Sequence, residues 1–214
     1  MKRNLKNGVL LLLCLAFLAL TGCDSGREFD PENNNMYVSS EGKLSTSFEV
    51  AVDQSYFSEA DMLGFCENEV KEYNRSKGAS ATAYQEEAAE EETLPVAIAS
   101  FTYGQTARLV LDYGTTEDYI AFNERDEARA ASVMFASAKN TTGLPDMTFV
   151  SVSDGSRVAA ASIIGDGKLK ILMVEGEQKV QVQGKLVYYS ENVTVTGEDT
   201  AVTGQEGYSY LVFK

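Results

Sequence analysis

Glycine residues recur at short intervals through the last third of the chain and divide it into short apolar segments. They stand at positions 155, 165, 167, 176, 184, 197, 204 and 207. Short segments with apolar and polar residues in alternation, separated by such turn residues, are typical of antiparallel strands. From residue 147 onward the sequence therefore predicts a β-rich part, with strands over 147–153, 156–164, 169–174, 180–183, 186–189, 193–196 and 208–213.

Two segments before this part carry helix signals. Ser58 and Asp61 have the spacing of a capping box, and Phe57 and Met62 that of a hydrophobic staple. An apolar stripe then follows at helical spacing, ending before Gly78, so we expect one long amphipathic helix over about 58–77; the stripe consists of Leu63, Cys66, Val70 and Tyr73. A second capping pattern at Thr115 and Asp118 predicts a short helix over about 116–123.

A hairpin is predicted between these helices. Residues 96–103 and 106–113 flank Gly104-Gln105, a pair suited to a type II′ turn. This turn would place Val96 opposite Tyr113 on a buried face and Phe101 opposite Arg108 on a wetter face. Phe101 and Tyr103 on the wetter face are the candidate exposed aromatic contact.

The remaining segments complete the predicted fold. Residues 36–40 and 44–53 are expected to be strands around Glu41-Gly42. For residues 124–140 a strand over 132–136 is favoured, and a helix is the alternative. We expect an α+β fold in which antiparallel sheet packs with one long and one short helix. Residues 36–214 are predicted to form one domain, with a subdivision near residue 145 left open.

The N-terminus carries a targeting pattern. Lys2, Arg3 and Lys6 precede an unbroken apolar run over 9–20, whose twelve residues are fewer than the roughly 20 that a membrane-spanning helix needs. A short apolar run behind a basic segment is typical of a signal peptide. The run ends at Leu20-Thr21-Gly22-Cys23, which resembles the lipobox of bacterial lipoproteins; an ordinary secretory signal with a chance cysteine is the alternative.

This resemblance implies a defined processing and location. Residues 1–22 would be removed as a signal peptide, and Cys23 would carry diacylglycerol and further acyl groups such as palmitate. The mature protein would then be held on the extracytoplasmic face of the cell membrane, with 23–35 as the lipidated cysteine and a flexible tether. Because Cys14 would leave with the signal and Cys23 would carry lipid, Cys66 would be the one free thiol, and a hydrophobic core rather than a disulfide must stabilise the domain.

Composition excludes several functions. The chain contains no histidine, which rules out histidine-based nucleophilic catalysis and histidine-ligated metals. Its formal charge of −14 argues against sequence-independent nucleic-acid binding. The acidity is concentrated in residues 24–147, with 9 basic and 24 acidic residues. Part of it lies in 83–93, interpreted as a solvated loop or frayed helical insert, with an acidic contact surface as the alternative.

No pattern in the sequence marks a catalytic, cofactor or metal residue, and we expect no cofactor. The segments 69–74 and 184–195 resemble parts of small lipoproteins of Gram-positive anaerobes, a resemblance that implies no activity and favours a non-catalytic surface role. The predicted function is therefore a lipid-anchored interaction or structural protein with a protein or glycan partner in the envelope. The alternatives are an envelope hydrolase of the glycoside type, with paired carboxylates, and a small-ligand or glycan-binding lipoprotein.

Overall fold

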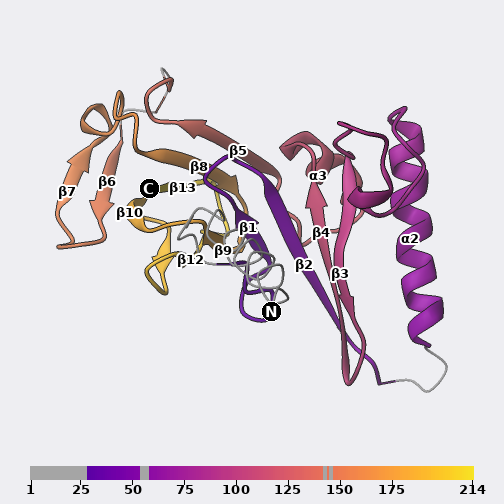
Figure 1. Cartoon of the computed structure of the whole chain (residues 1–214). Coiled ribbons are helices and arrows are strands. Elements are labelled where there is room, and N and C mark those ends of the chain that lie inside the picture. The colour runs from indigo at the N-terminus through magenta and orange to yellow at the C-terminus, as the bar shows by residue number, and fades with distance from the viewer. Residues whose placement is uncertain (1–27, 54–57, 142–143, 145–146) are drawn as a thin grey trace, which may run out of the picture.

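The computed structural model describes residues 28–53, 58–141, 144 and 147–214. The predicted signal peptide, Cys23 and Phe57 lie outside these residues. The described chain is mostly β and forms two sheets with two α-helices (Figure 1), so the α+β class with a β-rich C-terminal part is confirmed at this coarse level. None of the helices within the described ranges is both long and apolar enough to cross a bilayer.

The larger sheet has seven strands in the order β11-β12-β9-β1-β2-β4-β3. Its strands, in chain order, are β1 (Met36–Val38), β2 (Leu44–Ala51), β3 (Val96–Thr102), β4 (Thr106–Tyr113), β9 (Lys179–Val182), β11 (Thr194–Val195) and β12 (Thr200–Val202). The prediction of purely antiparallel sheet is wrong here, because β1 pairs with β9 in parallel, with Met36 opposite Val180. A parallel pair needs a long connection rather than a tight turn, and most of the domain lies between these two strands.

The smaller sheet has six strands in the order β5-β8-β13-β10-β6-β7, all paired antiparallel. They are β5 (Ser132–Ser137), β6 (Thr148–Ser151), β7 (Arg157–Ala159), β8 (Lys170–Glu175), β10 (Leu186–Ser190) and β13 (Tyr208–Phe213). The strand over 132–136 is thereby confirmed against the helical alternative. Strand β12 was not predicted from the sequence.

Strands β8 and β13 bury both of their faces. Leu172, Val174 and Leu211 belong to the core shared with β1, β2 and β4, whereas Met173 and Val212 alternate with them and belong to a second core. Phe149 and Ile163 fill that second core, and both are fully buried. The short 3-10 helix η3 (Ala160–Ser162) lies beside them. Because both of their faces are buried, the sequences of β8 and β13 are nearly continuous apolar runs.

Helix α2 (Glu59–Ser76) begins where the capping box predicts. The Ser58 hydroxyl accepts a hydrogen bond from the Asp61 backbone N–H at 3.1 Å. The predicted stripe residues contact the core. Figure 1 shows α2 beside β3, at the end of the molecule opposite the β6–β7 hairpin.

Helix α3 (Thr116–Phe122) also begins as predicted, since the Thr115 hydroxyl accepts from the Asp118 N–H at 3.0 Å. Its Tyr119 is buried against Tyr113 of β4, with ring centroids 5.3 Å apart.

The β3–β4 hairpin is present, but its predicted register holds for only half of its length. Val96 pairs with Tyr113 and Ile98 with Leu111, after which an irregularity between Ile98 and Ser100 shifts the pairing by one residue. Phe101 is therefore opposite Leu109 and not Arg108. The predicted type II′ turn is wrong as well, because Gly104 does not have the positive φ angle that such a turn requires.

Candidate functional site

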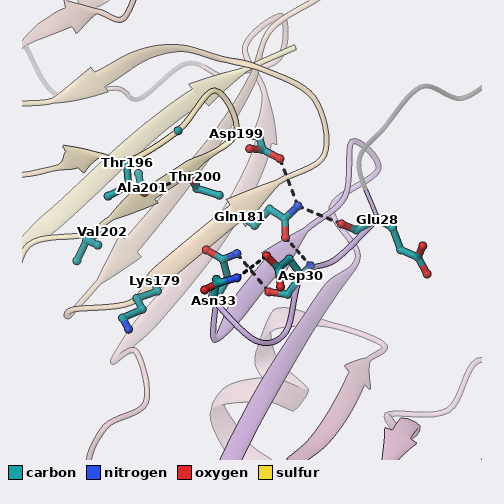
Figure 2. A pocket seen from close by; sticks show the side chains of 12 residues that line it. Glu28, Asp30, Asn33, Lys179, Gln181, Thr196, Asp199, Thr200, Ala201 and Val202 are labelled. Carbon is teal, nitrogen blue, oxygen red and sulfur yellow. Dashed lines mark hydrogen bonds between the residues drawn. The ribbon is translucent and has the colours of Figure 1, made fainter.

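A polar pocket of about 630 Å³ is the candidate functional site (Figure 2). Three segments that are distant in the sequence form it, namely residues 28–34, strand β9 with its Lys179 and Gln181, and the β11–β12 turn with the whole of β12. The volume lies within the range of small-molecule pockets, about 300–1,000 Å³. The complete lining consists of Glu28, Asp30, Asn33, Asn34, Lys179, Gln181, Thr196, Gly197, Asp199, Thr200, Ala201 and Val202.

Residues 28–35, which we call the strap, form the first wall and are folded by a local turn. The Asp30 carboxylate accepts hydrogen bonds from the Glu32 backbone N–H at 3.2 Å and from Asn33 Nδ2 at 2.8 Å. Such bonds from a side chain to the following residues are the usual reason that aspartate begins a turn. The turn closes with the Asn34 N–H donating to the Asp30 carbonyl at 3.2 Å.

Gln181 joins the strap to the opposite wall. Its Oε1 accepts from the Asp30 backbone N–H at 2.7 Å, and its Nε2 donates to the Glu28 carbonyl at 3.1 Å and to Asp199 Oδ2 at 3.2 Å. Gln181 and Asp199 are each only 2% exposed. Figure 2 shows Gln181 between the strap and Asp199. Both amide atoms are satisfied, so Gln181 holds the pocket walls together.

The pocket lining carries an excess of negative charge. Glu28, Asp30 and Asp199 contribute carboxylates, and Lys179 is the one basic residue among the lining residues. Hydroxyl and amide groups from Thr196, Thr200 and the two asparagines supply further donors and acceptors. Because Asp199 is buried, the carboxylates open to a ligand are those of Glu28 and Asp30, and they suit a hydrophilic ligand that donates hydrogen bonds. Within the described ranges no group of three or more acidic or cysteine side chains is arranged to hold a metal ion.

The candidate aromatic contact lies elsewhere. Phe101 is the last residue but one of β3, the outermost strand of the larger sheet, and Tyr103 follows in the turn, whereas the pocket is at the opposite end of the strand order. Both side chains are half-buried. The structure therefore does not bring the sequence-predicted residues to the pocket.

The acidic segment 83–93 has defined contacts. Glu92 accepts from the Ser80 N–H at 2.9 Å and from the Ser80 hydroxyl at 2.5 Å, and these bonds lower the pKa of Glu92. Glu87 accepts from Thr82 at the short 3-10 helix η2 (Gln85–Glu87). These two glutamates stabilise the loop, so part of the acidity that the composition reveals is structural.

Three further groups with shifted pKa values lie outside the pocket. Glu67 has a lowered pKa because it accepts from Lys71 and Tyr84, and Asp154 because it accepts from Ser156. A general acid in glycoside hydrolysis needs the opposite shift. Burial raises the pKa of the half-buried Cys66 thiol, which disfavours the reactive thiolate.

Sequence reasoning missed the pocket because its residues give no local signal. Gln181 stands between two valines in an alternating strand, where a polar residue is expected to face solvent. Asp199 lies in an ordinary turn sequence. The Asp30-Pro31 turn could have been recognised, but its partner on β9 could not. Comparison of the chain with protein-family models, curated proteins and solved structures found no significant match.

Proposed function

We propose that the protein is a bacterial lipoprotein, anchored through lipid on Cys23 to the extracytoplasmic face of the cell membrane. The observation that carries this proposal is the sequence of its first 23 residues, where a basic segment, a short apolar run and Leu20-Thr21-Gly22-Cys23 follow in the required order. Two or more acyl chains give stable membrane anchoring, whereas one chain gives only marginal binding.

The role of the anchored domain is proposed to be non-catalytic. This rests on the sequence, in which no histidine is present and no pattern marks a catalytic residue. We also propose that α2 is amphipathic, with Val70 on the core side and Phe65 on the outer side, where it is 66% exposed. Its outer side would then be available to a protein partner in the envelope.

A small-ligand or glycan-binding role is the second candidate, and the pocket favours it. Its walls present carboxylate, amide and hydroxyl groups around a volume of about 630 Å³, and such groups bind the hydroxyls of sugars and other polar solutes. A glycan array probed with the domain, with Thr200→Trp as the pocket-blocking variant, tests this role. Binding that survives the tryptophan would contradict the pocket as the site.

Anchoring is tested with Cys23→Ser, expressed in a bacterium that processes lipoproteins. We expect the wild-type protein in the membrane fraction with a mass increased by acyl groups, and the variant outside that fraction without them. The matched control is Cys66→Ser, which replaces a thiol of the domain and should leave fractionation and mass increment unchanged. An unmodified mass for the wild-type protein would contradict the proposal.

A further inference from the structure

The strap is bound to the domain along its whole length. Beyond the Gln181 bonds, Asn35 Nδ2 donates to Gln178 Oε1 at 2.9 Å, and Asn35 Oδ1 accepts from the Lys179 backbone N–H at 2.7 Å. The Ser47 hydroxyl donates to the Pro31 carbonyl at 3.0 Å. Phe29 stacks on Tyr37 of β1, with ring centroids 5.4 Å apart. The predicted flexible tether over 23–35 thus contacts the domain from residue 28 onward.

These contacts shorten the reach between anchor and domain. A free tether from Cys23 to Met36 could span about 47 Å, at up to roughly 3.6 Å per residue. With the strap bound, only the five steps from Cys23 to Glu28 remain, and they span at most about 18 Å. Glu28 itself lines the pocket, so the limit applies directly to the pocket rim.

We propose that the pocket-bearing edge of the domain, made by the strap, β9, β12 and the β11–β12 turn, lies against the lipid headgroup layer. This posture rests on the proposed anchoring at Cys23. In this orientation the edge contacts the lipid headgroups, and a ligand reaches the pocket at the membrane surface. Helix α2 is held outward, because β1, β2, β4 and β3 lie between β9 and the helix. Those four strand spacings amount to about 19 Å.

The net negative charge of the pocket-bearing edge fits a position near the headgroups without insertion between them. Glu28, Asp30 and Asp199 outnumber the one basic lining residue, Lys179, and none of the pocket residues offers a large exposed apolar side chain. Carboxylates are repelled by anionic lipid phosphates. The short reach keeps the edge close to the surface, and the repulsion opposes its insertion between the headgroups and into the hydrocarbon.

Resonance energy transfer from a dye on the protein to the vesicle surface tests this orientation of the domain. The lipidated full-length protein, in a Cys66→Ser background, carries a donor dye on Thr200→Cys at the pocket or on Phe65→Cys on α2. It is reconstituted in vesicles of phosphatidylcholine and phosphatidylglycerol that contain an acceptor dye on their headgroups. We expect transfer from position 200 to exceed that from position 65 at least about twofold, because the strands from β9 to β3 lie between them and alone span about 19 Å.

A second variant lengthens the chain between Cys23 and the strap and leaves the residues of the domain unchanged. A Gly-Ser linker of about ten residues inserted between Arg27 and Glu28 adds a mean length of about 17 Å, and transfer from position 200 should fall to about that from position 65. Equal transfer from both positions in the vesicle-bound protein without the linker would overturn the posture. So would transfer from position 200 that the linker leaves unchanged. Protein that does not associate with the vesicles would instead contradict the anchoring itself.

Discussion

Buried polar side chains in this domain find their partners in distant parts of the chain. Asn74 of α2 is fully buried, and its amide pairs with strand β3 as a neighbouring strand would. Its Nδ2 donates to the Val96 and Thr82 carbonyls at 2.8 and 2.9 Å, and its Oδ1 accepts from the Val96 N–H at 3.0 Å. One side chain therefore closes part of the open edge of the larger sheet.

Replacing Asn74 should destabilise the domain strongly. Asn74→Ala leaves two carbonyls and one N–H buried without partners, and the expected loss in the free energy of unfolding is about 2–4 kcal/mol. Urea denaturation measures this loss. The matched control is Asn140→Ala at an exposed asparagine, which should change stability by less than about 0.5 kcal/mol. Equal losses for the two variants would show that the Asn74 amide does not hold α2 to β3.

The Tyr84 hydroxyl predicts a pH dependence. It donates to Glu67 Oε1 at 2.8 Å, and burial together with this carboxylate raises the pKa of Tyr84 to about 12. An unfolded tyrosine ionises near pH 10. Above that pH the unfolded state loses a proton that the folded state keeps, so this contribution to stability is present below about pH 10 and is lost towards about pH 12.

Tyr84→Phe removes that contribution. The stability difference between wild-type protein and variant should therefore shrink between about pH 9 and pH 12, as measured by denaturation at each pH. Tyr208→Phe, at an exposed tyrosine, is the control and should give a constant difference. The Glu67 pKa is lowered, so its own contribution is present above its ordinary pKa and is lost as the pH falls through the folded value.

Among the strands and turns, Gly184 between β9 and β10 is the position with the least room. Its φ angle is +116°, and a Cβ atom there would collide with the carbonyl oxygen of Lys214. That carbonyl accepts from the Lys185 N–H at 2.9 Å, and the Lys214 N–H donates back to the Lys185 carbonyl at 3.1 Å. The turn and the end of β13 therefore fix each other.

Two glycine variants separate backbone strain from collision. Gly155 has a positive φ angle of 71° and open space around it. Gly155→Ala should therefore lower the free energy of unfolding only by the backbone strain, about 1–2 kcal/mol. Gly184→Ala adds the collision and should cost about 1–3 kcal/mol more. Thermal denaturation of both variants measures the difference. Equal costs would contradict the close approach of Lys214.

Elements whose signals are local could be predicted from the sequence. Ser58 and Thr115 cap helices where their spacing indicates, and strand β13 has the bounds that its apolar run predicts. The shifted register at Ala99 could not be read in this way, because the alternation of Val96 and Ile98 gives no sign of where it stops. Strand β12 was missed because its three residues are too few to form a pattern.

For the whole molecule, the missing information is which distant segments meet. The strand order of the larger sheet, the parallel pairing of β1 with β9 and the pocket all depend on contacts across more than a hundred residues, such as that of Asp30 with Gln181. Strands from both sides of residue 145 share each sheet. The candidate site therefore forms only when the whole domain has folded, whereas the proposed targeting signal lies in 23 consecutive residues.

The parallel pairing of β1 with β9 also governs the order in which the domain can fold. Asn35 and Lys179, which bond beside this pair, are 144 residues apart in the chain. A chain made from its N-terminus can join β1, β2, β4 and β3 early, but the free edge of β1 then waits for β9 to be synthesised. Such long-range closure slows folding, and an unpaired strand edge invites aggregation in the meantime. The seat of the strap is therefore complete only when β9 has been synthesised, and the pocket only when the later β11–β12 turn and β12 have followed.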